Sequence, residues 1–516
     1  MNAPETMVPG RAGRLRRWWL LAAIVIVGGF GLRFAYHNRG YGHPDEPITV
    51  AVVGYMRQSG DWDTNWAKAS LEPLLKYDQY NFSSYLHATY FFYRGAKLLP
   101  LTTEWLGAER GLLAYRFFSV ALGAFAVWQT LRLARRGFGR VTAVLAGGMA
   151  AVATLLVQDA HYARPEAFVT VLTLAAVGLC WPRPTLAGAR MVAGAFLIGV
   201  LVAAKVSMLL LAFLPLVPLV AAWPGRRGIA WVVALPVTAG LGFAAGAPGA
   251  VLHPEVFLNG VRYLATHYAG LHPPHSHPDG AAVGGMMARY FGATLGWPAM
   301  AGFVLGVGVL GGRRRWAELA LLAGPVVVFA GYFAGQSVFF ERNLSHVVPL
   351  FIIVAAAGAK FAADCLTERW PRISPVGPVA ILGLLLIHPS VRLTWPLVAT
   401  EFSGRGAQRH HEFAEATRAR HPEAPWLATL FLTEEPLHEL AAHFGRGTRP
   451  VLVGFSDYHD GWTVRNLQLL EQRFVVEAVA EEEETFPGLP PCTLLTYHRA
   501  RERYLLVRGV RTLSAR

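Results

Sequence analysis

Apolar runs of membrane-spanning length recur along this sequence as far as about residue 390, and they constrain its fold more than any other feature. Each run is roughly 17–25 residues long, which is the length a helix needs to cross about 30 Å of hydrocarbon. Only 16% of the residues are charged, against about 25% in an average soluble protein. The sequence therefore predicts an α-helical polytopic membrane protein.

Arginines mark which side of the membrane each gap between runs lies on. They cluster in alternate short gaps, at 11–17, 132–140, 183–190, 226–227, 313–315 and 369–372. Membrane proteins keep such residues in their cytoplasmic loops. The formal charge of +14 is thus explained by orientation, and no nucleic-acid partner is expected.

With those gaps in the cytoplasm, the chain crosses the membrane about eleven times. The predicted spans are 18–36, 111–131, 141–158, 165–182, 190–204, 207–222, 229–250, 289–310, 316–334, 344–364 and 374–390. The apolar run 190–222 is divided at Lys205, because this division keeps every later basic gap on the cytoplasmic side. The first run has no small-residue cleavage site after it and is interpreted as a retained anchor. The N-terminus is then cytoplasmic and the C-terminus extracytoplasmic.

Three long segments are expected outside the membrane. Loop 37–110 is predicted to hold a helix over 44–58 and an aromatic, basic helix over 83–99. Loop 251–288 is rich in proline, glycine and histidine. The tail 391–516 is predicted to be a small soluble α/β domain, separate from the membrane domain 1–390. Its expected strands are 426–432, 450–455, 474–480, 493–497 and 504–508, its helices are 408–420 and 434–444, and the run Glu481 to Glu484 is expected to be a solvated loop.

Carboxylates at the outer membrane edge are the candidate chemical groups. Asp45 and Glu46 follow the first span directly. They either supply a catalytic base or only complement the dipole of the helix they begin. Asp159 and Glu166 flank the short outer turn between the third and fourth spans. The alternative for this turn is an Asp159–Arg164 ion pair that merely orders it.

Two cations lie on the side where orientation does not require them, Lys205 and Arg342. Such a cation either binds an anion or extends its side chain to the interface. Tyr85 and Tyr90 in the aromatic helix either cover a lipid chain or anchor the helix at headgroup level. The spacing of His272, His275 and His277 invites a metal, but no carboxylate is closer than Asp279, so no metal site is predicted, and the three cysteines form no Cys-based site.

The motifs together resemble those of the GT-C superfamily, whose members transfer sugars from polyprenyl phosphates. Within it, the chain is most similar to the bacterial branch of protein O-mannosyltransferases and aminoarabinose transferases (glycosyltransferase family 39 and its relatives). The matching stretches are His43-Pro44-Asp45-Glu46, Tyr80 to Leu86, Tyr115-Arg116-Phe117-Phe118-Ser119, His161 to Glu166, and Glu341-Arg342-Asn343 with Pro349. Serines stand at 83 and 84 where the family often has consecutive prolines, and the tail resembles no named acceptor-binding domain.

The resemblance implies a role for each candidate residue. Asp45, the first acid of the pair, would deprotonate the acceptor hydroxyl, and Glu46 would orient the acceptor or hold an exterior helix. A second acid, in the outer turn, would face the active site, and Glu166 aligns with it better than Asp159 does. Arg342 matches the family and would bind the donor phosphate, and Lys205 is the second candidate for that contact by its position. His43, Tyr85 and Tyr90 would contact the donor lipid or the acceptor.

The implied activity is hexosyl or pentosyl transfer at a bacterial plasma membrane. The partners are a polyprenyl-phosphate sugar, membrane lipids and an extracytoplasmic lipid, glycan or protein acceptor. No cofactor is expected, and a divalent metal is permitted but not required, because the leaving group is a phosphomonoester.

Two other function classes fit part of the sequence. A transporter or flippase of a lipid-linked or anionic substrate would also keep charges near the membrane. Transporters place them near the midplane, on broken helices in paired repeats, whereas here they gather at the outer interface. A non-catalytic scaffold would fit the tail but leaves Asp45, Glu46 and Arg342 unexplained.

Overall fold

A computed structural model describes most of residues 10–405 and short pieces of the tail. The described ranges are 10–38, 43, 45–69, 79–98, 111–182, 188–221, 227–269, 280–372, 374 and 376–405, then 408, 412, 415, 419 and seven strands.

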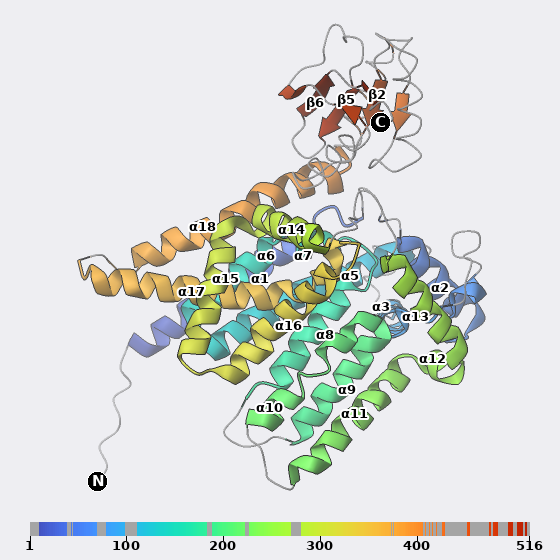
Figure 1. Cartoon of the computed structure of the whole chain (residues 1–516), viewed down its shortest axis with the longest axis horizontal. Helices are drawn as coiled ribbons and strands as arrows, with labels where there is room; N and C mark the ends of the chain where they lie inside the picture. The colour runs from blue at the N-terminus through green and yellow to red at the C-terminus, as the bar shows by residue number, and fades with distance from the viewer. Residues whose placement is uncertain are drawn as a thin grey trace.

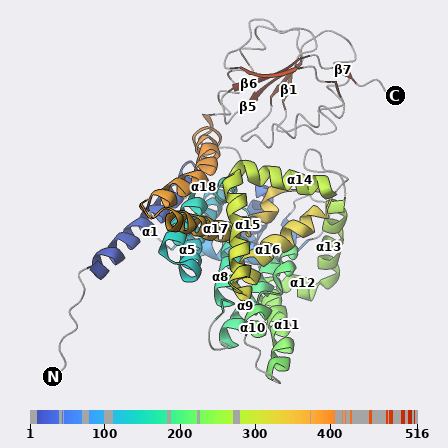
Figure 2. The ribbon, with the colours of Figure 1, turned by 60° about the vertical axis from the view of Figure 1, so that its left-hand side comes forward.

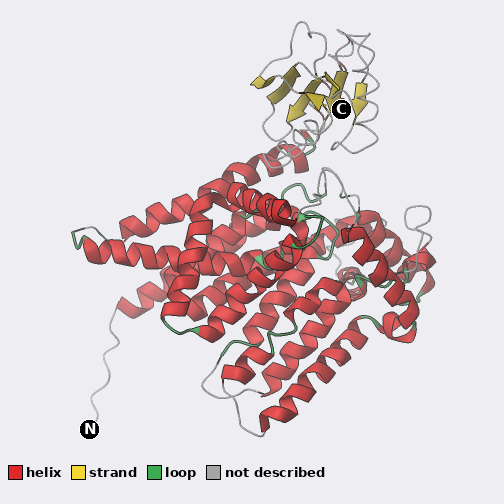
Figure 3. Cartoon of the chain, in the orientation of Figure 1, coloured by secondary structure: helices red, strands yellow, loops and turns green. Residues whose placement is uncertain are grey.

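Helices make up nearly all of the described part before residue 405 (Figure 1, Figure 3). The α-helices are α1 (Gly10–Phe34), α2 (Glu46–Ser59), α3 (Ser83–Ala96), α5 (Gly111–Phe138), α6 (Arg140–Val152), α7 (Thr154–Ala160), α8 (Glu166–Leu179), α9 (Gly188–Ala204), α10 (Leu216–Ala221), α11 (Arg227–Gly246), α12 (Pro248–Leu252), α13 (Pro254–Ala269), α14 (Gly280–Phe291), α15 (Trp297–Gly312), α16 (Trp316–Ala334), α17 (Val348–Arg369) and α18 (Val376–Pro396). Shorter 3₁₀ turns are η1 (Trp66–Ala69), η2 (Val206–Leu211) and η4 (Glu341–Leu344), and π turns are η3 (Gly292–Gly296) and η5 (Leu397–Phe402).

The helices have the lengths and composition of a multi-pass membrane protein. Six of those described are long and apolar enough to cross a bilayer, and the bent pair α6–α7 makes a seventh candidate. Four shorter apolar helices, at 18–34, 166–179, 188–204 and 206–221, coincide with the other predicted spans. The count of eleven therefore stays a prediction, because these four are shorter than the usual spanning length.

The bend between α6 and α7 is stabilised by groups from other helices. The two helices meet at 55° at Ala153, and the break frees backbone carbonyls that hydrocarbon cannot satisfy. Arg33 of α1, which is fully buried, donates to the carbonyls of Ala150 (2.9 Å) and Ala151 (2.8 Å). Thr394 of α18 donates to the carbonyl of Val152 at 2.8 Å. The bend turns α7 toward the loop 161–165, which carries site residues.

Replacing Arg33 with Leu is expected to destabilise the protein by about 2–4 kcal/mol, because buried carbonyls left unpaired cost about 1–3 kcal/mol each. The measurement is thermal unfolding of the purified protein in detergent. Arg132→Leu is the control, since Arg132 is an exposed arginine that lies over the Trp128 ring. Equal unfolding temperatures for the two variants would contradict this role of Arg33.

Glycines allow two helix pairs to approach closely. A Cβ atom at Gly199 of α9 would lie 1.9 Å from the carbonyl oxygen of Ala239 in α11. A Cβ atom at Gly358 of α17 would lie 2.0 Å from the carbonyl oxygen of Gly302 in α15. Small residues at such contacts are typical of helix packing in membranes. Figures 1 and 2 both show α9 and α11 side by side.

The local predictions for the segments before the tail that lie outside the predicted spans agree with the structure, and one of these segments contains helices that were not predicted. The predicted helices 44–58 and 83–99 correspond to α2 and α3, and the division at Lys205 is confirmed, because α9 ends at Ala204 and Lys205 is extended. The loop expected over 251–288 is largely helical, as α12, α13 and the start of the long helix Gly280–Gly312. Proline begins α12 and α13, where its missing N–H costs nothing. The histidines at 272, 275 and 277 lie outside the described residues.

The tail contains strands close to the predicted ones: β1 (Trp426–Ala428), β2 (Val451–Gly454), β3 (Phe474–Val475), β4 (Ala478–Glu482), β5 (Leu494–His498), β6 (Arg503–Arg508) and β7 (Arg511–Thr512). Five form a mixed sheet in the order β1-β2-β5-β6-β4, and β3 pairs with β7. The first two pairs of the sheet are parallel and the last two antiparallel.

One prediction for the tail is wrong, and another falls mostly outside the described residues. Glu481 and Glu482, expected in a loop, belong to β4, where Glu481 pairs with Leu505. This strand is at the edge of the sheet, a place where charged residues are common because they discourage pairing with other chains. The helix predicted at 434–444 and most of the one at 408–420 lie outside the described residues, so the α/β domain stays a prediction.

Candidate functional site

Four segments bring charged side chains together at one end of the helix bundle. They are the start of α2, the loop 161–165 between α7 and α8, the junction of α9 with η2, and the turn η4 before α17. The side chains that meet there are Asp45, Arg164, Glu166, Lys205 and Arg342. All but Arg164 were predicted site residues, from positions up to 297 residues apart in sequence.

These five residues form a continuous chain of ion pairs. Arg164 contacts Oδ2 of Asp45 on one side and, on the other, both oxygens of Glu166 at 3.2 Å. Lys205 Nζ lies 3.7 Å from Glu166 Oε1. Arg342 Nη2 lies 3.5 Å from Asp45 Oδ2. Three cations thus surround two carboxylates, which leaves the cluster one positive charge in excess and suits it to an anion.

Asp45 is the most accessible carboxylate of the cluster. Its side chain is 34% exposed, whereas that of Glu166 is 2% exposed. Burial alone would raise the pKa of Asp45, but Arg164 and Arg342 outweigh it and hold the pKa well below its usual range. Asp45 is therefore a carboxylate at neutral pH, and it faces the only cation of the cluster with substantial exposure among the described residues, Arg342 at 29%.

His43 supports the backbone next to Asp45. Its Nδ1 accepts the backbone N–H of Asp45 at 3.0 Å and lies 3.3 Å from Arg164 Nη1. Burial together with the positive charges of Arg164 and Arg342 lowers the pKa of His43 well below its usual value. A neutral imidazole whose Nδ1 accepts this bond fits that environment.

Glu46 is fully engaged in structural contacts. One oxygen accepts from Arg116 Nε (2.8 Å) and from the backbone N–H of Ala163 (2.8 Å). The other accepts from Arg116 Nη2 (2.7 Å) and from the backbone N–H of His43 (3.0 Å). This carboxylate joins α2, α5 and the loop 161–165, so the option that Glu46 holds an exterior helix fits the contacts better than a catalytic role.

Glu46→Gln is expected to destabilise the protein by about 3–5 kcal/mol, because it leaves the buried guanidinium of Arg116 without its anion. The measurement is thermal unfolding together with the double variant Glu46→Gln, Arg116→Met. The double variant is expected to be more stable than Glu46→Gln alone, since it removes the unpaired charge. A Glu46→Gln protein as stable as the wild type would contradict the structural assignment.

Asp159 lies beside the cluster and not in its ion-pair chain. It is buried at the end of α7, and among the described residues its Oδ2 has no hydrogen-bond partner. Arg164 pairs with Asp45 and Glu166 and makes no ion pair with Asp159. The alternative of an Asp159–Arg164 pair that only orders the turn is therefore wrong.

The two tyrosines predicted to contact the donor or the acceptor are both buried among the helices. Tyr85 is fully buried, with its ring 6.0 Å from that of Phe168 and 6.5 Å from that of Phe118. Tyr90 is 4% exposed and accepts from Arg94 at 3.4 Å. Alternation of buried and exposed faces along α3 places both rings inside. Their contact with the donor or the acceptor stays a prediction.

The described residues contain no group of three or more His, Cys, Asp or Glu side chains placed to hold a metal. Two histidines of segment 251–288 lie among the described residues, and each stacks on an aromatic ring: His253 on Tyr80 and His267 on Phe340.

Arg164 and Arg116 are the residues that the sequence prediction undervalued. Arg164 was considered only as an alternative partner for Asp159, and Arg116 only as part of a motif. The signal was available in the sequence, because both lie on the predicted outer side, where orientation calls for no arginine. The reasoning that selected Lys205 and Arg342 applies to them equally.

Solved structures share this architecture, although no family model and no curated protein sequence matches the chain. ArnT from Cupriavidus metallidurans in the apo state is 15% identical, with a TM-score of 0.49 over 96% of this chain and 98% of that one. ArnT bound to undecaprenyl phosphate is 14% identical, with a TM-score of 0.48 over the same shares.

The archaeal oligosaccharyltransferase AglB from Archaeoglobus fulgidus, in complex with an inhibitory peptide and a dolichol-phosphate, aligns with a TM-score of 0.50 at 13% identity, over 74% of this chain and 56% of that one. This chain has the GT-C fold. The predicted resemblance is confirmed at the level of fold. Within the GT-C fold, the charged cluster occupies the ends of the helices that carry the matching motifs.

Proposed function

We propose that this protein is a membrane glycosyltransferase that moves a sugar from a polyprenyl-phosphate donor to a hydroxyl of an extracytoplasmic acceptor. The observation that carries the proposal is the cluster itself. One accessible carboxylate, Asp45, stands against Arg342, with Arg164 and Lys205 behind it. A base beside an excess of cations is what glycosyl transfer from a lipid phosphate requires. The dolichol-phosphate in the AglB complex supports this class of donor.

In the proposed reaction, Asp45 accepts the proton of the acceptor hydroxyl as its oxygen bonds to the sugar carbon. The bond from that carbon to the phosphate oxygen breaks, and the polyprenyl phosphate leaves with the bonding electrons. Arg342 and Lys205 neutralise the charge that develops on this phosphate. Glu166 holds Arg164 and Lys205 in place through its ion pairs.

Donor binding would also change the pKa of Asp45, the proposed base. In the free protein Arg342 and Arg164 make Asp45 a weak base by lowering its pKa. A donor phosphate that draws Arg342 toward itself weakens the Arg342–Asp45 contact, which is already 3.5 Å long. The proton affinity of Asp45 then rises when the substrate is present.

The orientation belongs to the same proposal. About eleven crossings, a cytoplasmic N-terminus and an extracytoplasmic tail domain would put the cluster on the outer side of a bacterial plasma membrane. The tail follows α18 and η5 directly in sequence, so it would lie on the same side as the acceptor.

A cysteine introduced at Asn259 on α13 is expected to react with an impermeant thiol reagent in intact spheroplasts. Native Cys365, which is exposed near the end of α17, is expected to react only after lysis. Single-cysteine versions of the protein separate the two signals. Labelling of Cys365 in intact spheroplasts would contradict the orientation.

A flippase is the competing function, and one assay distinguishes the two. The purified protein is placed in vesicles with a short-chain polyprenyl-phosphate sugar and a mixture of envelope acceptors. A transferase releases polyprenyl phosphate and leaves intact donor in its original leaflet. Movement of intact donor across the bilayer, without release of polyprenyl phosphate, would support the flippase.

A further inference from the structure

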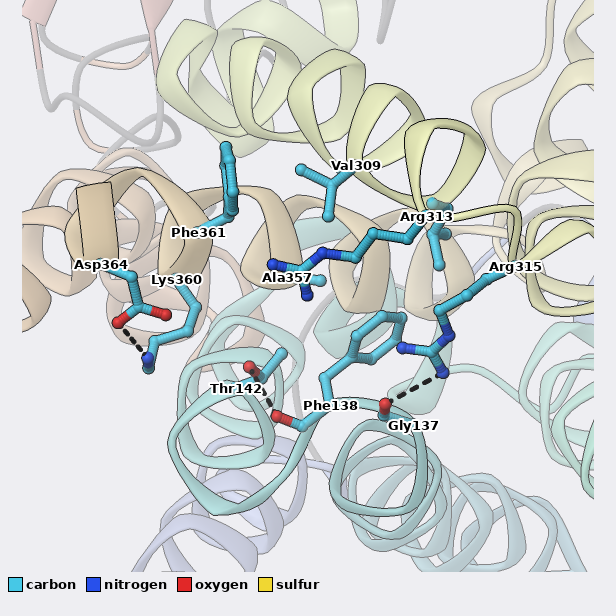
Figure 4. Close-up of a pocket in the computed structure, with 12 residues that line it drawn as sticks. Gly137, Phe138, Thr142, Val309, Arg313, Arg315, Ala357, Lys360, Phe361 and Asp364 are labelled. Atoms are coloured by element: carbon cyan, nitrogen blue, oxygen red, sulfur yellow. Dashed lines mark hydrogen bonds and ion pairs between the residues drawn. The ribbon is translucent and has the colours of Figure 1, made fainter.

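A second cationic site lies far from the cluster, in a cavity of about 290 Å³ between helices (Figure 4). Its walls come from the end of α5, the start of α6, the end of α15 and the second half of α17. Three of its lining residues are cations and one is a carboxylate: Arg313, Arg315, Lys360 and Asp364.

The cavity lies one membrane thickness from the cluster. Arg116, which binds Glu46, is near the start of α5, and Phe138, which lines the cavity, is at its end. The 22 residue steps between them along α5 correspond to about 33 Å at 1.5 Å per residue. Trp316, next to the cavity, is 61% exposed, as expected for a residue at the membrane interface. The cavity is therefore at the opposite interface.

A tight turn at the end of α15 orients Arg313 and Arg315 toward the cavity. Helix α15 ends with the N–H of Arg315 bonded to the carbonyl of Leu310 and the N–H of Arg314 bonded to that of Gly311. Arg314 has a left-handed φ of 54°, which is the Schellman arrangement usually made with glycine. Arg313 and Arg315 on either side of it line the cavity, and Arg314 does not.

Aromatic rings hold both lining guanidinium groups at the walls. Arg313 lies 5.6 Å from the centroid of the Phe361 ring, and Arg315 lies 5.0 Å from that of Phe138. Figure 4 shows the Arg313 side chain extended across the cavity past Ala357. Orientation alone requires positive charge in this loop, but it does not require that the arginines stack around a cavity.

The charge balance leaves one cation unmatched. Arg315 is paired with Glu318 at 2.9 Å and donates to the carbonyl of Gly137, and Lys360 is paired with Asp364. Among the described residues, Arg313 has no carboxylate within ion-pair distance. One excess positive charge in a cavity open to the interface matches a phosphate group that carries one negative charge.

We propose that this cavity binds the phosphodiester headgroup of an anionic phospholipid. Arg313 is its principal contact, and Arg315 and Lys360 complete the positive wall. The site is independent of the proposed glycosyl transfer and lies at the other membrane surface.

The test uses the full-length protein in nanodiscs of phosphatidylcholine with a minority of phosphatidylglycerol. Native mass spectrometry counts the phosphatidylglycerol molecules retained. Wild type is expected to retain one more than Arg313→Gln, with affinity about tenfold higher, because a charge-assisted contact is lost. Arg314→Gln is the matched control, since it removes the same charge from the same turn outside the cavity, and it is expected to behave as wild type.

A second arm identifies the source of the phosphate. Inorganic phosphate is titrated against the protein with bound phosphatidylglycerol, and it is expected not to displace the lipid. Displacement by inorganic phosphate, with equal retention of phosphatidylcholine, would overturn the lipid assignment in favour of a free anion. Equal losses in Arg313→Gln and Arg314→Gln would overturn the cavity itself, because they would indicate only the general charge of the loop.

Discussion

Replacing Asp45 with Asn is expected to lower the rate of sugar transfer by a factor of about 10²–10⁴, the usual contribution of a positioned base. Asparagine keeps the size of the side chain but cannot accept the proton. The variant should still fold, because Glu166 remains to pair Arg164. The measurement is initial rate with a polyprenyl-phosphate sugar, alongside thermal unfolding.

Asp61→Asn is the matched control, since Asp61 is another acid of the segment between α1 and α5. Its contacts lie at the exposed surface, with Lys68, Tyr55 and the backbone N–H of Asp63. It is expected to leave the rate unchanged. Wild-type turnover by Asp45→Asn would remove Asp45 from the mechanism. If a stable Glu46→Gln protein were the inactive one, the two acids would exchange roles.

Arg342→Ala is expected to weaken donor binding and to slow the chemical step together. Arg342 Nη2 lies 3.5 Å from Oδ2 of Asp45, the proposed base, and its guanidinium lies 4.5 Å from the centroid of the Phe340 ring. Loss of a charged hydrogen bond costs about 1.5–3 kcal/mol, or about 10–100-fold in affinity. Arg342→Lys should recover only part of the lost affinity and rate. The planar guanidinium of arginine can bind a phosphate through two N–H donors at once, and the ammonium group of lysine cannot.

The measurement is inhibition by polyprenyl phosphate, the expected product, in each variant. Lys205→Ala should show a milder effect, mostly on affinity, since Lys205 lies behind Glu166 in the ion-pair chain. Arg262→Ala is the control, because Arg262 is an arginine on α13 that bonds Asn259. Inhibition of Arg342→Ala equal to that of wild type would mean that Arg342 only reaches toward the interface.

The sequence predicted helix positions well because the membrane imposes one structure on apolar runs. The break at Lys205 could be predicted from charge, since moving it would place arginines on the wrong side. The bend at Ala153 could not, because it depends on Arg33 and Thr394, which reach it from helices distant in sequence. No helix was predicted within the exterior loop 251–288, because proline at a helix start and proline in an irregular segment look alike in sequence.

The sequence predicted every member of the charged cluster except Arg164, but not the contacts between them. Asp45, Glu166, Lys205 and Arg342 each stood out by residue type and position, and they do meet. Glu46 differs from Asp45 by one position, yet α2 turns its side chain toward Arg116 and the backbone of Ala163. A helix rotates successive side chains by about 100°, so adjacent acids face different surroundings that only the tertiary structure defines. Likewise, only the tertiary structure shows that Tyr85 and Tyr90 lie on the buried face of α3.

The most direct test of the proposed transfer is mass spectrometry of lipid-linked sugars and envelope glycoconjugates. It compares cells that carry the wild-type gene, the Asp45→Asn variant or no gene. The account predicts that the last two accumulate the same polyprenyl-phosphate sugar and lose the same glycosylated product, which would identify donor and acceptor together. Identical lipid-linked sugars and glycoconjugates in all three would contradict it.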